Sequence, residues 1–144
     1  MTDEQALEPQ LRRVLVADDE PHIGHIIRLK LEQGPYQVVL VSSGTEALEH
    51  LSGSEPIDVV LLDIMMPGAT GLEVLEQARA MPHRAGTPII ILTAKGQDAD
   101  RRQALELGAT DFFTKPFSPK KLLARVDELF GAPAPGGERP PHPE

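Results

Sequence analysis

Carboxylates, a hydroxyl and an ammonium stand in this sequence at positions where apolar, strand-like runs end. The carboxylates are Asp18, Asp19 and Asp63, the hydroxyl belongs to Thr93 and the ammonium to Lys115. If these runs are parallel strands, their C-terminal ends meet at one edge of a sheet and gather the five side chains there. Neighbouring carboxylates repel one another, so such a site requires a compensating cation or raised pKa values. The expected chemistry is therefore the binding of a divalent cation.

The available ligand atoms indicate which cation this is. Only oxygen ligands are present, because neither Cys nor His stands at these strand ends. Mg²⁺ suits one or two carboxylates together with waters and a phosphoryl oxygen better than Zn²⁺ does. The sequence therefore predicts Mg²⁺ as the cofactor. His22 and His25 lie three residues apart in a helical segment, and an exposed helix face explains this spacing better than a metal pair.

The elements that must position these residues follow from the apolar pattern. Short apolar runs predict five buried strands: Val14–Ala17, Tyr36–Val41, Ile57–Leu62, Ile89–Leu92 and Asp111–Thr114. Segments with helical periodicity follow these strands: one beginning at Pro21, Gly44–Leu51, one with Leu72, Leu75 and Ala78 inward, Gln97–Leu107 closed by Gly108, and one capped by Ser118.

The alternation of strands and helices predicts an α/β fold, in which helices cover both faces of a five-stranded parallel sheet. Acids follow the first and third strands, and none follows the second. This placement fits the doubly wound, flavodoxin-like strand order 2-1-3-4-5, whose ligand crevice lies between the first and third strands.

Composition limits the domain organisation and the partners. A chain of 144 residues has the size of one domain, which we expect at residues 12–131. Residues 1–11 read as a disordered leader and 132–144 as a Pro/Gly-rich disordered tail or linker. The formal net charge of -8 argues against direct binding of nucleic acid or anionic lipid.

Several absences favour a cytoplasmic location without membrane contact. The chain contains no cysteine, and its N-terminus lacks the pattern of a signal peptide. No apolar run approaches the ~20 residues that span a bilayer.

The motifs at the strand ends together resemble the response-regulator receiver domain of two-component signalling. They are Asp18-Asp19, the stretch from Leu62 to Gly68 with Gly71, Thr93-Ala94, and Lys115-Pro116-Phe117. The resemblance extends from about Arg13 to Phe130. Each motif alone is short, but four in the right order at strand ends make a specific signal.

The resemblance implies that Asp63 is the phosphoacceptor. Its carboxylate would take a phosphoryl group from the phosphohistidine of a sensor histidine kinase or phosphotransfer protein and hold it as an acyl phosphate. In this family Asp18, Asp19, the acceptor and a backbone carbonyl, here that of Met65, would bind Mg²⁺. Lys115 would neutralise a phosphoryl oxygen.

The family also implies a switch. The Thr93 hydroxyl would bond to a phosphoryl oxygen and draw its loop inward, and Phe112 would turn from exposed to buried. This change would alter the surface of the fourth helix, fifth strand and fifth helix and so control an unknown downstream partner. The protein would be a signalling switch with slow autodephosphorylation rather than an enzyme.

The oligomeric state and the extent of the protein stay open. Asp111 and Arg125 match the reciprocal charges with which some receivers dimerise, whereas Lys121 departs from that pattern. We expect a monomer or a weak homodimer that phosphorylation strengthens. With no effector domain after Gly131, the chain would be a single-domain regulator or a receiver excised from a larger one.

Three other functions compete with this interpretation. A phosphohydrolase that forms an aspartyl phosphate typically sets an acid two residues after its nucleophile, where this chain has Met65. A flavin-binding module needs a phosphate-binding loop after the first strand, where this chain has Asp18-Asp19-Glu20. An interaction domain with a vestigial pocket is the third alternative, and against it every predicted site position is filled by a competent residue. Met65 and Lys95 flank the acceptor without orienting a hydrolytic water, which predicts a phosphoryl half-life of minutes or longer.

Overall fold

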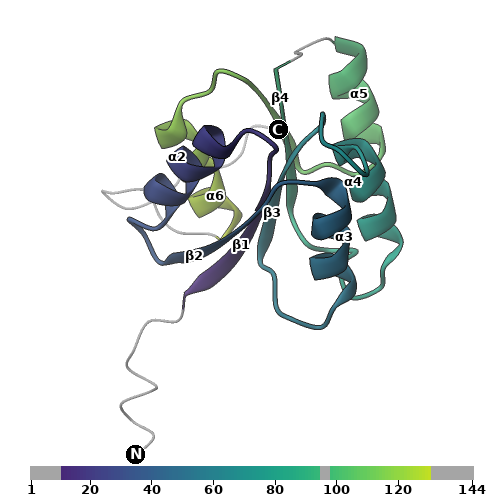
Figure 1. The fold of residues 1–144 in the computed structure, drawn as a ribbon, viewed down its shortest axis with the longest axis horizontal. Helices are drawn as coiled ribbons and strands as arrows, with labels where there is room; N and C mark the ends of the chain where they lie inside the picture. The colour runs from purple at the N-terminus through teal and green to yellow at the C-terminus, as the bar shows by residue number, and fades with distance from the viewer. Residues whose placement is uncertain (1–10, 95–97, 131–144) are drawn as a thin grey trace, which may run out of the picture.

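The sheet of this protein has five parallel strands in the order β2-β1-β3-β4-β5. The structure is a computed structural model that describes residues 11–94 and 98–130. Figure 1 shows the sheet between two layers of helices. The strands are β1 Arg12–Ala17, β2 Tyr36–Val41, β3 Val59–Asp63, β4 Ile89–Thr93 and β5 Asp111–Thr114. The helices are α2 Pro21–Leu31, α3 Gly44–Ser52, α4 Gly71–Ala80, α5 Asp98–Glu106 and α6 Pro119–Leu129.

The strand order confirms the doubly wound prediction. β1 pairs with both β2 and β3, and its last residue, Ala17, lies opposite Leu62 of β3. Asp63 in turn lies opposite Leu92 of β4. The C-terminal ends of β1, β3 and β4 therefore lie next to one another, as the sequence pattern required.

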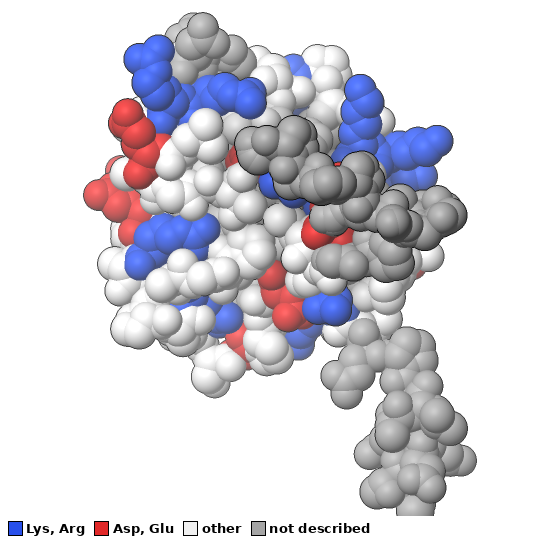
Figure 2. All heavy atoms as spheres, turned by 180° about the vertical axis from the view of Figure 1, so that it is seen from behind, with Lys and Arg blue, Asp and Glu red and all other residues white. Residues whose placement is uncertain are grey.

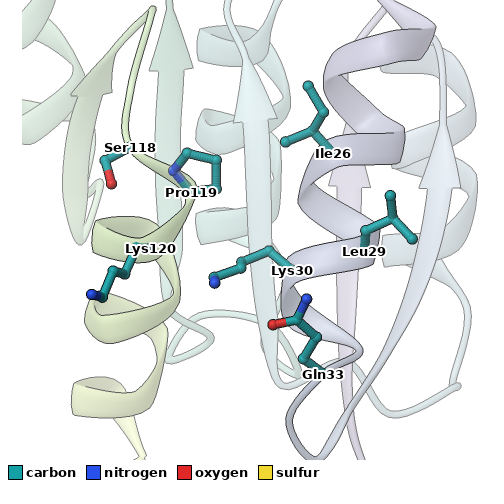
Figure 3. A pocket seen from close by; sticks show the side chains of 7 residues that line it. All are labelled: Ile26, Leu29, Lys30, Gln33, Ser118, Pro119 and Lys120. Carbon is teal, nitrogen blue, oxygen red and sulfur yellow. The ribbon is translucent and has the colours of Figure 1, made fainter.

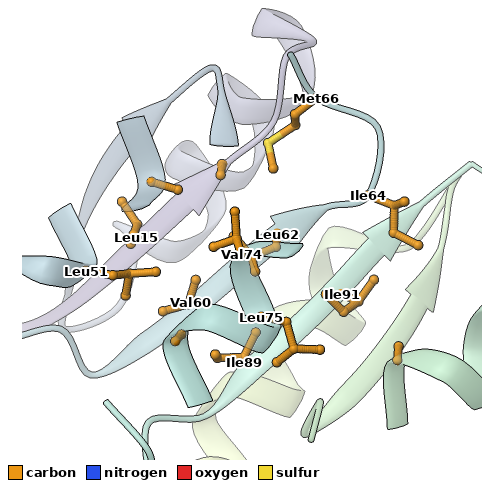
Figure 4. Packing of buried hydrophobic residues seen from close by; sticks show 14 of the residues in the cluster. Leu15, Leu51, Val60, Leu62, Ile64, Met66, Val74, Leu75, Ile89 and Ile91 are labelled. Carbon is orange, nitrogen blue, oxygen red and sulfur yellow. The ribbon is translucent and has the colours of Figure 1, made fainter. Parts of the chain in front are cut away.

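Two hydrophobic cores hold the layers together, one on each face of the sheet. α3, α4 and α5 cover one face, and α2 and α6 cover the other (Figure 1). Figure 4 shows the larger core, in which side chains from β1, β3 and β4 meet those of α3 and α4. All five residues of β3 and all five of β4 are buried, because helices pack on both sides of these strands.

Short polar side chains set where most of the helices begin. Thr70 and Glu73 form a reciprocal capping box at the start of α4, and Ser43 and Ser118 cap α3 and α6. α2 is different: Pro21 occupies a first-turn position, and the N-cap residue, Glu20, makes no capping side-chain bond to any described residue. The carboxylate of Glu20 is thus available for another contact.

Element boundaries differ from the sequence pattern by one or two residues. β3 ends at Asp63 rather than at Leu62, so the acceptor candidate is the last residue of the strand itself. Gly108 follows α5 with φ +105°, which confirms the predicted left-handed position. Most of the predicted leader, the whole predicted tail, and Lys95 and Gln97 lie outside the described residues. Within the described ranges, no helix is both long and apolar enough to cross a membrane.

Candidate functional site

The polar residues that end β1, β3, β4 and β5 meet at one edge of the sheet. Asp63 is 4% exposed at the end of β3, and Asp18 is 5% exposed directly after β1. Thr93, the last residue of β4, is completely buried. Lys115 directly follows β5, and its side chain is only 8% exposed. The sequence pattern therefore identified a buried polar site.

Lys115 lies among three carboxylates. Its Nζ is 2.8 Å from Asp18 Oδ2, 2.9 Å from Glu20 Oε1 and 3.3 Å from Asp63 Oδ2. It donates hydrogen bonds to Glu20 and Asp63. The contact with Asp18 is an ion pair, and Asp18 Oδ1 accepts a bond from the Glu20 backbone N–H.

The carboxylates form a group that could hold a metal ion. Asp18, Glu20 and Asp63 each offer one oxygen, and these oxygens all lie within 4.8 Å of one another. Three carboxylates against the one ammonium of Lys115 leave a negative excess that a hard divalent cation would balance. All-oxygen ligands suit Mg²⁺, so the residues present fit the predicted cofactor.

The composition of this group differs from the sequence expectation in one member. Asp19 is exposed and is not part of the group found among the described residues, so its role as a ligand stays a prediction. Glu20 takes part instead, and the sequence reasoning gave it no role. The only signal was its place as the third acid in a row before Pro21. His22 and His25 are exposed, as expected of a solvated helix face.

The electrostatics of the pocket act most strongly on Asp63. Burial, followed by the negative charge of Asp18, raises the pKa of Asp63 from 3.8 to about 6, although Lys115 opposes this shift. Burial lowers the pKa of Lys115, but its contacts with Asp18 and Glu20 and the charge of Asp63 outweigh burial and raise that pKa overall. The ionised form of Asp63 is therefore destabilised in this pocket, while the lysine stays protonated.

The loop after Asp63 packs tightly under the site. A Cβ atom on Gly71 would lie 2.3 Å from the carbonyl oxygen of Asp63, so only glycine lets α4 begin this close to β3. Gly68 has φ +86°, a conformation that glycine adopts without strain. The loop leaves Met65 57% exposed beside the pocket. The use of its carbonyl as a metal ligand stays a prediction.

Phe112, the switch candidate, faces inward in this structure. It is 5% exposed and belongs to the core between the sheet and α3, α4 and α5. The guanidinium of Arg101 on α5 lies 5.8 Å from the centre of its ring. The structure thus shows the buried position that the family associates with the switched state. Movement of Phe112 stays a prediction.

The two charges considered for dimerisation meet within one chain. Arg125 Nε lies 2.5 Å from Asp111 Oδ2, and Arg125 also contacts Glu128 at 3.2 Å. For Asp111 of one copy to pair with Arg125 of another, the contact between these residues within each chain would first have to break. That requirement is compatible with a monomer or a weak dimer.

An apolar groove begins beside the site and runs along the surface between α2 and α6. Figure 3 shows one part of it, a hollow of about 360 Å³ lined by Ile26, Leu29, Lys30 and Gln33 of α2 and by Ser118, Pro119 and Lys120. A second hollow of about 240 Å³ continues to Lys115 and shares Ile26 and Pro119 with the first. Ile26 is 43% exposed and Leu29 is 69% exposed. The groove thus connects an exposed apolar surface to the polar pocket.

Comparison with known proteins identifies a relative in sequence. Over 118 residues the chain is 43% identical to the transcriptional regulatory protein ResD of Bacillus subtilis, which covers 81% of this chain and 47% of ResD. The chain thus spans about half the length of this relative.

Solved structures agree with the sequence match. The receiver domain of the Francisella response regulator 1452 has a TM-score of 0.77 and 34% identity, covering 83% of this chain and 97% of the other. The chemotaxis response regulator CheY4 of Vibrio cholerae has a TM-score of 0.77 and 29% identity, covering 83% and 99%. The sequence profile of the response regulator receiver domain matches residues 14–127. The chain belongs to the response regulator receiver domain family of two-component signalling.

Proposed function

We propose that Asp63 accepts a phosphoryl group from the phosphohistidine of a sensor histidine kinase or phosphotransfer protein. The observation that carries the proposal is a buried carboxylate at the end of β3, 3.3 Å from the Lys115 ammonium and within an acidic group. A carboxylate oxygen of Asp63 forms the new P–O bond as the P–N bond of the donor breaks, and the donor imidazole leaves with the bonding electron pair. Lys115 and Thr93 stabilise charge on the phosphoryl oxygens.

The proposed cofactor is Mg²⁺, held by Asp18, Asp19, Asp63 and the Met65 carbonyl. When bound, it neutralises negative charge on the transferring phosphoryl group. Lys115 remains protonated, and its ammonium lies 3.3 Å from the acceptor carboxylate. Incubation with Mg²⁺ and acetyl phosphate, followed by intact-mass measurement, should show the gain of one phosphoryl group that EDTA prevents.

The proposed output is a change at the surface formed by α5, β5 and α6. The Thr93 hydroxyl moves toward the phosphoryl group. Phe112 lies on β5, which pairs with β4, and Arg101 of α5 lies over its ring. The downstream partner is a protein, since the net charge is -8 and Figure 2 shows acidic and basic side chains interspersed over the described surface seen there. Direct nucleic-acid binding is not proposed for residues 12–131, the predicted receiver unit.

The groove between α2 and α6 is the proposed docking site of the phosphohistidine donor. It offers an apolar surface that leads to Lys115, and Figure 3 shows Lys30 reaching from α2 toward α6 beside it. An amphipathic helix with an acidic edge would fit this surface. Such docking would bring a phosphohistidine on the helix to Asp63.

Ile26→Ser is expected to slow phosphorylation by a phosphohistidine protein but not phosphorylation by acetyl phosphate. The rate of transfer from a phosphohistidine protein that phosphorylates the wild type should fall at least about tenfold, because a central apolar contact is lost. Phosphorylation by acetyl phosphate should stay within about twofold, since a small molecule needs no groove. Gel separation of phosphorylated chains measures both rates. Leu105→Ser, which changes a side chain 46% exposed on α5, is the matched control; an equal loss with both donors would contradict the docking site.

The acyl phosphate is expected to persist for minutes or longer. Met65 occupies the position where phosphohydrolases place an acid, and its exposed thioether cannot act as a general base. The phosphoprotein is made with acetyl phosphate, freed of donor by rapid desalting, and followed in Mg²⁺ buffer. Complete decay within seconds would contradict the proposal and favour a hydrolase. The matched variant Met65→Glu should shorten the lifetime.

A further inference from the structure

Glu20 uses its side chain in an unusual way for its position. It is the N-cap residue of α2, a position where a Ser, Thr, Asp or Asn side chain normally accepts a bond from the backbone of the first turn. Within the described part of the chain no such bond is made, and Glu20 Oε1 instead accepts a hydrogen bond from Lys115 Nζ at 2.9 Å. Glu20 thus contributes to the pocket rather than to its own helix.

The distances show that Glu20 competes with Asp63 for the ammonium of Lys115. An ammonium has three donors, and three carboxylates surround this one. Nζ is closer to Asp18 and Glu20, at 2.8 and 2.9 Å, than to Asp63, at 3.3 Å. Without Glu20, the ammonium could approach Asp63 more closely. Asp63 would then be better neutralised by the protein itself.

Exposure separates Glu20 from the other members of the pocket. Its side chain is 49% exposed, whereas those of Asp18, Asp63 and Lys115 are 0%, 6% and 8% exposed. An ion pair with one exposed partner is partly screened by solvent and readily exchanged. Glu20 can therefore hold the Lys115 ammonium from the solvent side before phosphorylation and release it without disturbing the core.

We propose that Glu20 is a positioning residue for Lys115, which it holds away from Asp63 so that the acceptor carboxylate remains available to a divalent cation. The inference rests on the proposed function, because it assigns Glu20 a task in preparing the same pocket. Glu20 acts on cation binding through the lysine and is not itself required as a ligand.

Calorimetric titration of the full chain with MgCl₂, without any phosphodonor, tests this role. Glu20→Gln should weaken Mg²⁺ binding about fivefold, the range expected for an exposed ion pair. Glu20→Asp keeps the charge but is one methylene too short to reach Nζ, so it should weaken binding to a similar extent. Because Asp is a favourable N-cap residue, this variant does not endanger α2. Full affinity in Glu20→Asp would overturn the proposal, since charge alone would then suffice.

A double-mutant cycle with Lys115→Met shows whether Glu20 acts through the lysine. In the Lys115→Met background, Glu20→Gln should change Mg²⁺ affinity by less than about twofold. An equal loss in both backgrounds would make Glu20 a direct contributor to the cation site and overturn the inference, as would no loss in either. If the wild type bound no Mg²⁺, the proposed function itself would fail.

Kinetics give a second readout that a structural defect would not reproduce. With acetyl phosphate, Glu20→Gln should raise the Mg²⁺ concentration for half-maximal phosphorylation about fivefold. The maximal rate at saturating Mg²⁺ should stay within about twofold, because Lys115 is then free to contact the phosphoryl group. A lower maximal rate with an unchanged half-maximal concentration would contradict the proposed division of roles.

Discussion

Asp63→Asn is expected to abolish acyl-phosphate formation. An amide oxygen does not act as the anionic nucleophile that the transfer requires, and no other carboxylate occupies the end of β3. The rate of phosphorylation by acetyl phosphate in Mg²⁺ should therefore fall at least about 100-fold. Lys115→Ala should slow the reaction without stopping it, because the nucleophile remains in place.

Intact mass and gel separation of phosphorylated chains measure this loss. The matched control is Asp58→Asn, the same change just before the opposite end of β3, where Asp58 accepts a bond from the Arg13 backbone that an asparagine oxygen can also accept. The control should be phosphorylated at the wild-type rate. Undiminished phosphorylation of Asp63→Asn, at any residue, would show that the acceptor has been misassigned.

The fold could be predicted because strand burial leaves a strong pattern in the sequence. β3 and β4 are buried on both faces, so nearly every residue is apolar until the strand ends at the site. The polar residue that interrupts each run is therefore conspicuous, and the parallel arrangement brings Asp63, Thr93 and Lys115 together. Topology alone thus predicted most of the pocket.

What the sequence could not show depends on side-chain orientation. The exposed Glu20 lies at a helix start, where no apolar periodicity indicates the direction of a side chain. Its turn toward Lys115 reflects the local charge balance, which becomes visible only when the strand ends are assembled. The groove was missed for a related reason: Ile26 follows the apolar periodicity of α2, yet the packing of α6 leaves it 43% exposed.

The pocket is arranged so that its own charge favours a cation. Asp63 and Asp18 are both buried, and one ammonium shared with Glu20 does not compensate all of the negative charge. Such a site reduces the stability of the cation-free protein, as binding sites often do. Stability should therefore increase when one of the repelling charges is removed.

Asp63→Asn is expected to raise the melting temperature of the metal-free protein by about 5–10 °C at neutral pH. A pKa raised from 3.8 to about 6 corresponds to about 3 kcal/mol of unfavourable free energy once the carboxylate is ionised in the folded state. Asparagine removes that charge, while Lys115 keeps its contacts with Asp18 and Glu20. Calorimetry in EDTA measures the difference.

The pH dependence distinguishes charge repulsion from a general effect of the substitution. Between pH 3.8 and about 6 the folded protein binds a proton at Asp63 that the unfolded chain has lost, so this group lowers stability as the pH rises through that window. The stabilisation by Asp63→Asn should therefore be small near pH 4 and reach its full size above about pH 6.5. Mg²⁺ should stabilise the wild type and the Asp58→Asn control but hardly affect Asp63→Asn. A lower melting temperature for Asp63→Asn at neutral pH without metal would contradict the repulsion. An increase in melting temperature that did not change with pH would show that charge repulsion is not its cause.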